Sequence, residues 1–215
     1  MSLAAASIHP APTRILHAAR ALMTERDLLE VSLADISQRA GTNVALVSYY
    51  FGNREGLMLA IAEADAKQAR GDLDRLLAAD MPSAAKIRIH IKGLISSYYR
   101  RPYLHRLLQK LLREGSPEAS AKIGSHFVRP VADARRAIIA RGVARREFRD
   151  VDASLMSFVI DGACAHIFSS HEGRRAILDG GELNRQLADH YMEMVSDLVI
   201  RGLSADPDIE SGPTD

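Results

Sequence analysis

The sequence predicts an all-α protein with a three-helix amino-terminal domain of helix-turn-helix type and a larger carboxy-terminal helical domain. Three observations lead to this expectation. Apolar residues recur at spacings of three and four along most of the 215-residue chain, which is typical of amphipathic helices. Residues 32–57 contain the caps and the glycine turn that join short helices. No two alternating segments are joined by a hairpin signal, so no sheet is expected.

A first short helix is expected over residues 32–40. Ser32 can cap its amino terminus, and Asp35, three residues later, can complete a capping box. One apolar face then recurs at helical spacing and is formed by Leu33, Ile36 and Ala40. An amphipathic helix over residues 13–26 precedes this one and is expected to pack behind it.

A tight turn and a second helix follow. Gly41 stands where a left-handed backbone conformation is needed, and Thr42 or Asn43 can cap a helix over residues 44–51. The inner face of that helix is expected to consist of Val47 and Phe51. A helix, a short glycine turn and another helix form the arrangement that places the second helix in the DNA major groove.

The remaining helices follow from the same patterns. Asn53 can cap a long helix over residues 54–79, and Met81-Pro82-Ser83 would end it. Residues 86–92 alternate apolar and charged side chains as a strand would, but a lone strand could not satisfy its backbone, so we expect a helix that runs to Pro102. Further helices are expected over residues 104–113, over 117–147 with a start or kink at Pro130, and over 152–171 and 182–203.

The segment that follows residues 13–26 resembles the amino-terminal domain of the tetracycline-repressor (TetR) family. The matching residues are Ser32, Leu33, Asp35, Ile36, Ala40 and Gly41, then Tyr49, Tyr50 and Phe51, and finally Arg54, Glu55 and Leu57. The resemblance covers about a quarter of the chain. It implies a sequence-specific DNA-binding transcriptional regulator, expected to be a repressor that a small-molecule ligand releases from its operator.

The same resemblance implies the domain organisation. Residues 1–57 would form the helix-turn-helix domain, with 1–12 as a loose arm. Residues 58–204 would form the helical domain that binds the effector and makes the dimer contact, and 205–215 a disordered tail.

By resemblance, DNA contacts are expected from Val44, Ala45, Leu46, Ser48, Tyr49 and Tyr50, and further DNA contacts, to phosphate, are expected from Thr42 and from Arg54 at the amino terminus of the next helix. The second helix contains no Arg or Lys, so binding energy must come from phosphate contacts elsewhere. Arg54 and Tyr50 are the main expected phosphate partners, and Arg39 is a further one. Two alternatives stay open: Val44 and Leu46 could be half-buried, and one of the two tyrosines could pack on the first helix.

Charge is unevenly distributed although the net charge is only +1. Residues 81–149 carry sixteen basic and four acidic side chains, whereas residues 150–215 carry four basic and thirteen acidic ones. The basic middle could attract an anionic amphiphile, but pairing between it and the acidic end of the chain is the favoured interpretation.

Composition also bounds the class of protein. A single cysteine, Cys164, suits a reducing compartment, and neither a signal peptide nor a membrane-spanning run is evident, so a soluble, cytoplasmic protein without membrane contact is expected. Cys164, His166 and His171 do not have zinc-ligand spacing, and no catalytic motif occurs. We therefore expect no enzyme activity, no cofactor and no metal.

The last two expected helices indicate a homodimer, which would bind a palindromic double-stranded operator. Their apolar surfaces are formed by Leu155, Phe158, Val159, Gly162, Ala163 and Cys164, and by Leu183, Leu187, Tyr191, Met194, Leu198 and Val199. A small hydrophobic or anionic effector could contact an aromatic set, consisting of Tyr98, Tyr99, Tyr103, Phe127 and Phe158. The alternative is a constitutive, architectural DNA-binding protein without an effector pocket.

Overall fold

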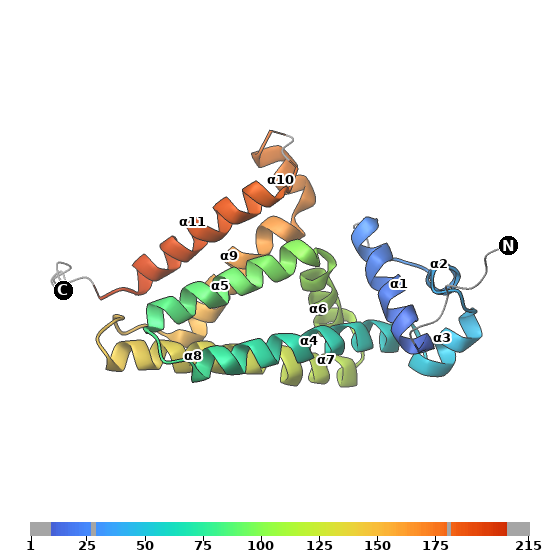
Figure 1. Cartoon of the computed structure of the whole chain (residues 1–215), viewed down its shortest axis with the longest axis horizontal. Coiled ribbons are helices and arrows are strands. Elements are labelled where there is room, and N and C mark those ends of the chain that lie inside the picture. Colours follow the sequence, from blue (N-terminus) through green and yellow to red (C-terminus); the bar gives the residue numbers. More distant parts are fainter. Residues whose placement is uncertain (1–9, 27–28, 180–181, 206–215) are drawn as a thin grey trace. The chain divides into compact units, whose positions relative to one another are not determined.

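The computed structural model describes residues 10–26, 29–179 and 182–205, and every regular element among them is helical (Figure 1). The all-α prediction is therefore confirmed. The first nine residues of the expected arm and the expected tail from residue 206 onward lie outside the described residues. Residues 11 and 12, placed in the arm by the sequence, belong to the first helix.

The chain forms two compact units. The first consists of residues up to 69 together with 101–128, and the second of residues 70–100 together with those from 129 onward. The long helix α4 (Arg54–Ala78) contributes to both. The domain boundaries expected near residues 57 and 204 stay a prediction.

The first unit contains the helices predicted from the caps Ser32, Asn43 and Asn53, which are α2, α3 and the start of α4. It also contains the amino-terminal helix and three consecutive short elements of residues 103–128. Its elements besides α4 are α1 (Ala11–Glu25), α2 (Leu33–Arg39), α3 (Val44–Phe51), α6 (Tyr103–Glu114), α7 (Pro117–Ile123) and the π-helix η1 (Gly124–Val128). Its amino-terminal core is formed by Ile15, Ala19, Leu22, Met23, Ile36, Val47 and Leu57.

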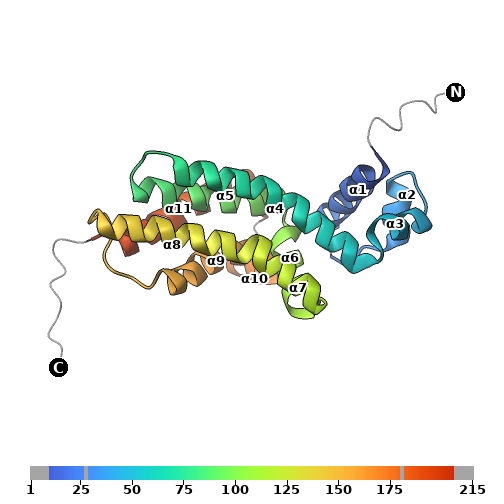
Figure 2. The same cartoon turned by 90° about the horizontal axis from the view of Figure 1, so that it is seen from below.

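The second unit is built around α5 (Ser83–Arg100), which packs against its other major helices (Figures 1 and 2). These are α8 (Arg129–Ala144), α9 (Ala153–Ser169) and α11 (Arg185–Leu203), and the short helix α10 (His171–Ile177) follows α9. The alternating segment at residues 86–92 lies within α5, as expected. Ile87 and Ile91, four apart, are fully buried, whereas Ile89 is 47% exposed. The helical period therefore decides which isoleucines enter the core.

Two expectations about the end of the chain were wrong. The helix expected over 152–171 is α9, but the short helix α10, which is bent by 84° from it, was not predicted. Helix α11 starts at Arg185, where Asn184 caps it, and not at residue 182. Cys164 and Val199, expected on outward apolar surfaces, are 0% and 3% exposed and belong to the core. Among the described residues no single helix is long and apolar enough to span a membrane; only the bent pair of α9 and α10 meets that test of length and composition.

The basic middle of the chain pairs with its acidic end inside the second unit. Arg88 of α5 lies 2.6 Å from Asp197 and 3.3 Å from Glu193 of α11, and Lys92 lies 2.5 Å from Glu193. This supports the interpretation that the opposite charges of these two regions balance each other within the fold.

Candidate nucleic-acid interface

Helix α3 has both ends held by local hydrogen bonds. Asn43, not Thr42, is its cap: its side-chain oxygen accepts from the Leu46 N–H at 2.8 Å. Gly41, with φ +63°, makes the turn before it, and Gly52, with φ +73°, ends the helix. Both glycines adopt the left-handed conformation that a side chain disfavours. The helix therefore starts and stops where the sequence signals predicted.

Two faces of α3 differ in exposure. Val47 is 1% exposed and packs inward, whereas Tyr49 is 80% exposed. Three more of the expected contact residues are also exposed: Val44, Ala45 and Tyr50. Leu46, Ser48 and Thr42 are intermediate. Neither tyrosine is buried, which argues against the alternative that one of them packs on the first helix.

The two tyrosines support each other. Their ring centroids are 5.2 Å apart at an interplanar angle of 76°, an edge-to-face arrangement. Tyr50 also lies 6.4 Å from the ring of Phe51. Tyr49 therefore projects outward with one side of its ring against a neighbour, so its position is restricted although most of its surface is accessible.

The cations of the helix-turn-helix segment have acceptors within the protein. Arg14 donates to the Ala40 carbonyl at 3.2 Å and so ties α1 to the turn before α3, a contact that sequence reasoning missed. Arg26 pairs with Asp35 at 2.7 Å, and Arg39 pairs with Glu25. Any phosphate contact by Arg26 or Arg39 would therefore have to compete with a carboxylate.

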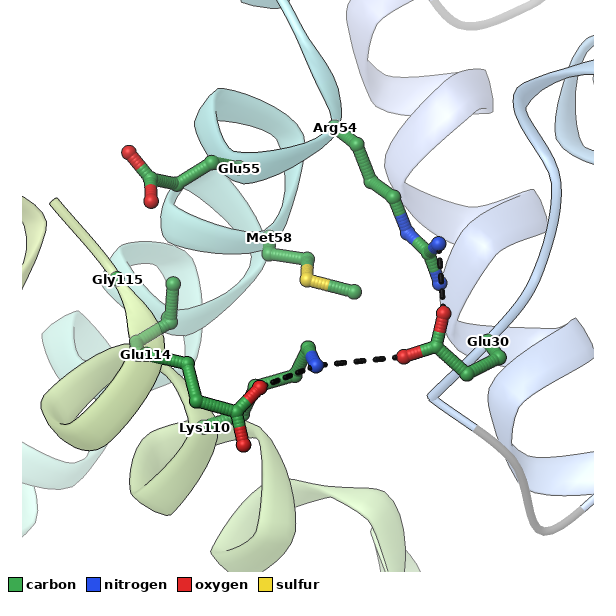
Figure 3. Close-up of a pocket in the computed structure, with 8 residues that line it drawn as sticks. Glu30, Arg54, Glu55, Met58, Lys110, Glu114 and Gly115 are labelled. Atoms are coloured by element: carbon green, nitrogen blue, oxygen red, sulfur yellow. Dashed lines mark hydrogen bonds and ion pairs between the residues drawn. The ribbon is translucent and has the colours of Figure 1, made fainter.

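Arg54 makes contacts within the protein that the sequence did not predict. Its guanidinium donates to the Leu29 carbonyl at 2.8 Å and lies 2.7 Å from the Glu30 carboxylate (Figure 3). Expected as a phosphate partner at a helix amino terminus, Arg54 connects the start of α4 to the segment before α2. A role in phosphate binding stays a prediction, but the structure gives this side chain a contact within the protein.

The aromatic residues expected to bind an effector are divided between the two units. Tyr103 and Phe127 belong to the first unit, and Tyr98, Tyr99 and Phe158 to the second. Tyr98 and Tyr103 are 7% and 1% exposed, whereas Phe158 is 78% exposed and faces away from the core. Phe158 therefore does not line an enclosed space, and the role of the other four stays a prediction.

The second unit contains a buried polar cluster that the sequence did not predict. Arg135, 1% exposed, donates to His90 at 2.9 Å, to the Ser157 carbonyl at 3.0 Å and to Asp161 at 2.6 Å. Burial, together with the Arg135 charge, lowers the pKa of His90 to about 3. Within the described ranges, no three His, Cys, Asp or Glu side chains are grouped so that they could hold a metal ion.

A capped, outward-facing second helix after a glycine turn, within an all-helical chain, defines a protein of the helix-turn-helix class. Two family models match. Residues 15–61 match the bacterial regulatory proteins of the tetR family, and residues 80–208 match the tetracyclin repressor-like carboxy-terminal domain. The chain therefore belongs to the TetR family, whose members are DNA-binding transcriptional regulators.

Solved structures share the fold at low sequence identity. A TetR/AcrR-family regulator from Thermobifida fusca is 22% identical with a TM-score of 0.68, covering 89% of this chain and 97% of its own. FadR from Bacillus subtilis, in complex with stearoyl-CoA, is 17% identical with a TM-score of 0.70, at 89% and 98% coverage. PfmR from Thermus thermophilus is 22% identical with a TM-score of 0.70, at 89% and 100% coverage. No protein with a curated description matches the sequence.

Proposed function

We propose that this protein is a homodimeric repressor that binds a palindromic operator through α3 and leaves it when a small molecule binds. One observation carries the DNA-binding part of the proposal. Tyr49 exposes 80% of its surface on a helix whose opposite side, at Val47, is buried. A large aromatic side chain held outward in this way has no role in the core of its own subunit.

The dimer part of the proposal rests on an outward apolar surface of α9 and α11, which pack against each other within the second unit. We call this surface the α9–α11 apolar face. It consists of Leu155, Phe158, Val159, Met194 and Leu198, between 51% and 78% exposed. A group of large exposed apolar side chains marks an interaction surface. A two-fold axis through it would present two copies of α3 to two half-sites.

The effector is proposed to be a hydrophobic small molecule. An anionic head group would suit residues 81–113, which carry eight basic and no acidic side chains. Arg88 and Lys92 are already paired with acids of α11, which weakens that argument. Stearoyl-CoA, present in the complex of Bacillus subtilis FadR, has a long acyl chain and is therefore a useful first probe.

The test begins with selection of duplexes from a random pool by the full-length protein. We expect enrichment of a palindrome that wild-type protein binds as a dimer. A set of acyl-CoAs and hydrophobic acids is then added to the complex, and at least one is expected to raise the Kd for the selected duplex. Failure to enrich any sequence rejects the DNA-binding proposal. Enrichment with no response to any compound instead favours the constitutive, architectural alternative.

A further inference from the structure

The start of α4 is joined by side chains to the corner between α6 and α7, within the first unit. Glu30 accepts from both sides: Arg54 lies 2.7 Å from one carboxylate oxygen, and the Lys110 ammonium lies 3.3 Å from the other (Figure 3). Lys110 also lies 2.7 Å from Glu114, one turn further along α6. The hydrogen bond from Lys110, with the Arg54 charge, lowers the pKa of Glu30, so its carboxylate stays ionised.

A second contact lies beside the first. Both carboxylate oxygens of Glu55 are used: one accepts the Ser116 N–H at 2.8 Å and the other the Ser116 hydroxyl at 2.7 Å. Ser116 is the cap of α7, so Glu55 binds the residue at which that helix begins. The hydroxyl hydrogen bond lowers the pKa of Glu55. Consecutive residues of α4, Arg54 and Glu55, therefore belong to the same junction with the α6–α7 corner.

This junction is not filled by side chains. Its charged residues and Gly115 surround a cavity of about 300 Å³, together with Met58 and Leu111 (Figure 3). Met58 and Leu111 are themselves buried, at 7% and 2% exposed. Partly exposed ion pairs contribute little stability individually. The contact is therefore made by a few directional polar groups beside an open space, and it can change without disrupting the core.

The position of the junction makes it relevant to α3. Only Gly52 and Asn53 separate the last residue of α3 from Arg54, and Asn53 accepts from the Gly56 N–H at 2.9 Å. A Cβ at Gly56 would lie 2.0 Å from the Phe51 carbonyl oxygen, so the end of α3 and the first turn of α4 touch directly. A shift in the start of α4 would therefore move α3.

We propose that the α6–α7 corner sets the orientation of α3, with Glu55 and Lys110 as positioning residues for DNA recognition. This inference rests on the proposed DNA-binding function. Each residue acts through the start of α4: Glu55 as its second residue, and Lys110 through Glu30 and Arg54. Removing either one should leave phosphate-driven attraction in place and reduce the fit of α3 to its preferred sequence.

The experiment compares full-length Glu55→Ala and Lys110→Ala with two matched controls. Glu118→Ala and Lys122→Ala remove the same charges from α7, where these residues pair with each other at 3.0 Å. The Kd is measured for the duplex that the wild type selects and for a random duplex of equal length, with Tm recorded for each variant. Coupling through a packed contact is typically worth about 1 kcal/mol, which corresponds to about a fivefold change in Kd.

The expected signature is a fall of about fivefold in the ratio of operator to random-duplex affinity in both test variants, with no change of ratio in the controls. Because Glu55→Ala and Lys110→Ala alter charge in opposite directions, a direct electrostatic effect on DNA could not lower the ratio in both. Glu55→Gln keeps an oxygen that accepts from Ser116, so it should restore most of the ratio.

Other outcomes overturn the inference. An unchanged ratio in Lys110→Ala, a variant at a partly exposed site, rejects it even if Glu55→Ala fails to fold. A parallel loss of both affinities with a lowered Tm assigns these residues a purely structural role. If the wild type enriches no sequence, the proposed function and this inference are both rejected. If the wild type enriches a sequence and both variants keep the wild-type affinity ratio, only this inference is rejected.

Discussion

Asp65 of α4 lies 3.0 Å from the guanidinium of Arg20 on α1 and is only 6% exposed. Arg101 lies 3.1 Å from the same carboxylate, and the Tyr103 hydroxyl is 3.3 Å away. One buried acid therefore holds together side chains from α1, from α6 and from the short segment between α5 and α6. Burial and the neighbouring carboxylate raise the pKa of Tyr103, which keeps its hydroxyl as a donor.

Asp65→Asn should destabilise the protein by about 3 kcal/mol, because it leaves two largely buried guanidinium groups without their carboxylate. Urea denaturation at neutral pH measures the change. Asp72→Asn is the control: this acid is 60% exposed in its ion pair with Arg75, and its loss should cost less than about 0.5 kcal/mol. Equal effects of the two substitutions would contradict the importance of burial here.

Stability should fall in mild acid because of His90. Its folded-state pKa of about 3 lies below the ordinary value of 6.5, so below pH 6.5 the unfolded chain takes up a proton that the folded protein excludes. The contribution of uncharged His90 to the free energy of unfolding is fully present above pH 6.5 and is lost progressively as pH falls toward 3. The expected slope is about 1.4 kcal/mol per pH unit.

The measurement is urea unfolding of wild type and His90→Gln at several pH values between 7.5 and 5. The glutamine keeps an oxygen that can accept from Arg135 but does not titrate. The difference in slope between the two proteins isolates His90 from the other histidines. Identical slopes would show that His90 is accessible to protons in the folded state.

Tyr49→Ala should separate DNA binding from stability. Because the side chain is 80% exposed, its loss should change the free energy of unfolding by less than about 0.5 kcal/mol. Affinity for the selected duplex should fall by about 1–3 kcal/mol, as for loss of a base contact. Val47→Ala is the opposite control, expected to destabilise by about 2 kcal/mol because the side chain is 1% exposed. Unchanged operator affinity in Tyr49→Ala would remove this residue from the interface.

Phe158→Arg should convert the protein to a monomer. It places a charge at the centre of the α9–α11 apolar face, where a partner subunit would have to desolvate it. Sedimentation velocity at micromolar concentration reports the change. Ile177→Arg, at a residue of α10 that is 77% exposed, makes the same substitution outside this face and should leave the mass unchanged. A wild-type protein that sediments as a monomer would reject the dimer.

The helices of the first fifty-seven residues were predictable because their signals are local. Ser32 caps α2 by accepting from Asp35, and Asn43 and Asn53 likewise accept from the N–H three residues later. Such bonds depend on neighbouring residues only, so spacing in the sequence is sufficient to find them. The bend after α9 carried no comparable signal in the sequence. Helix α10 has only seven residues, contains a glycine and has no apolar stripe.

The contacts of the charged residues could not be predicted in the same way. The sequence indicates Arg54 as a phosphate partner, yet its carbonyl acceptor within the protein lies 25 residues earlier in the chain. The acid that binds Arg20 lies 45 residues away in the sequence, and Arg135 and His90 are separated by the same number of residues. Periodicity indicates which face of a helix is buried, but it does not specify which distant side chain meets it.

Helix α3 presents valine, alanine and tyrosine side chains and contains no Lys or Arg. In the major groove, the apolar group that such a surface can recognise is the methyl on C5 of thymine. Replacing thymine with deoxyuridine leaves base pairing intact and removes only that methyl, so it should weaken operator binding at the contacted positions. Methylated cytosine carries a methyl at the same place, which would make this regulator sensitive to covalent marking of its own binding site.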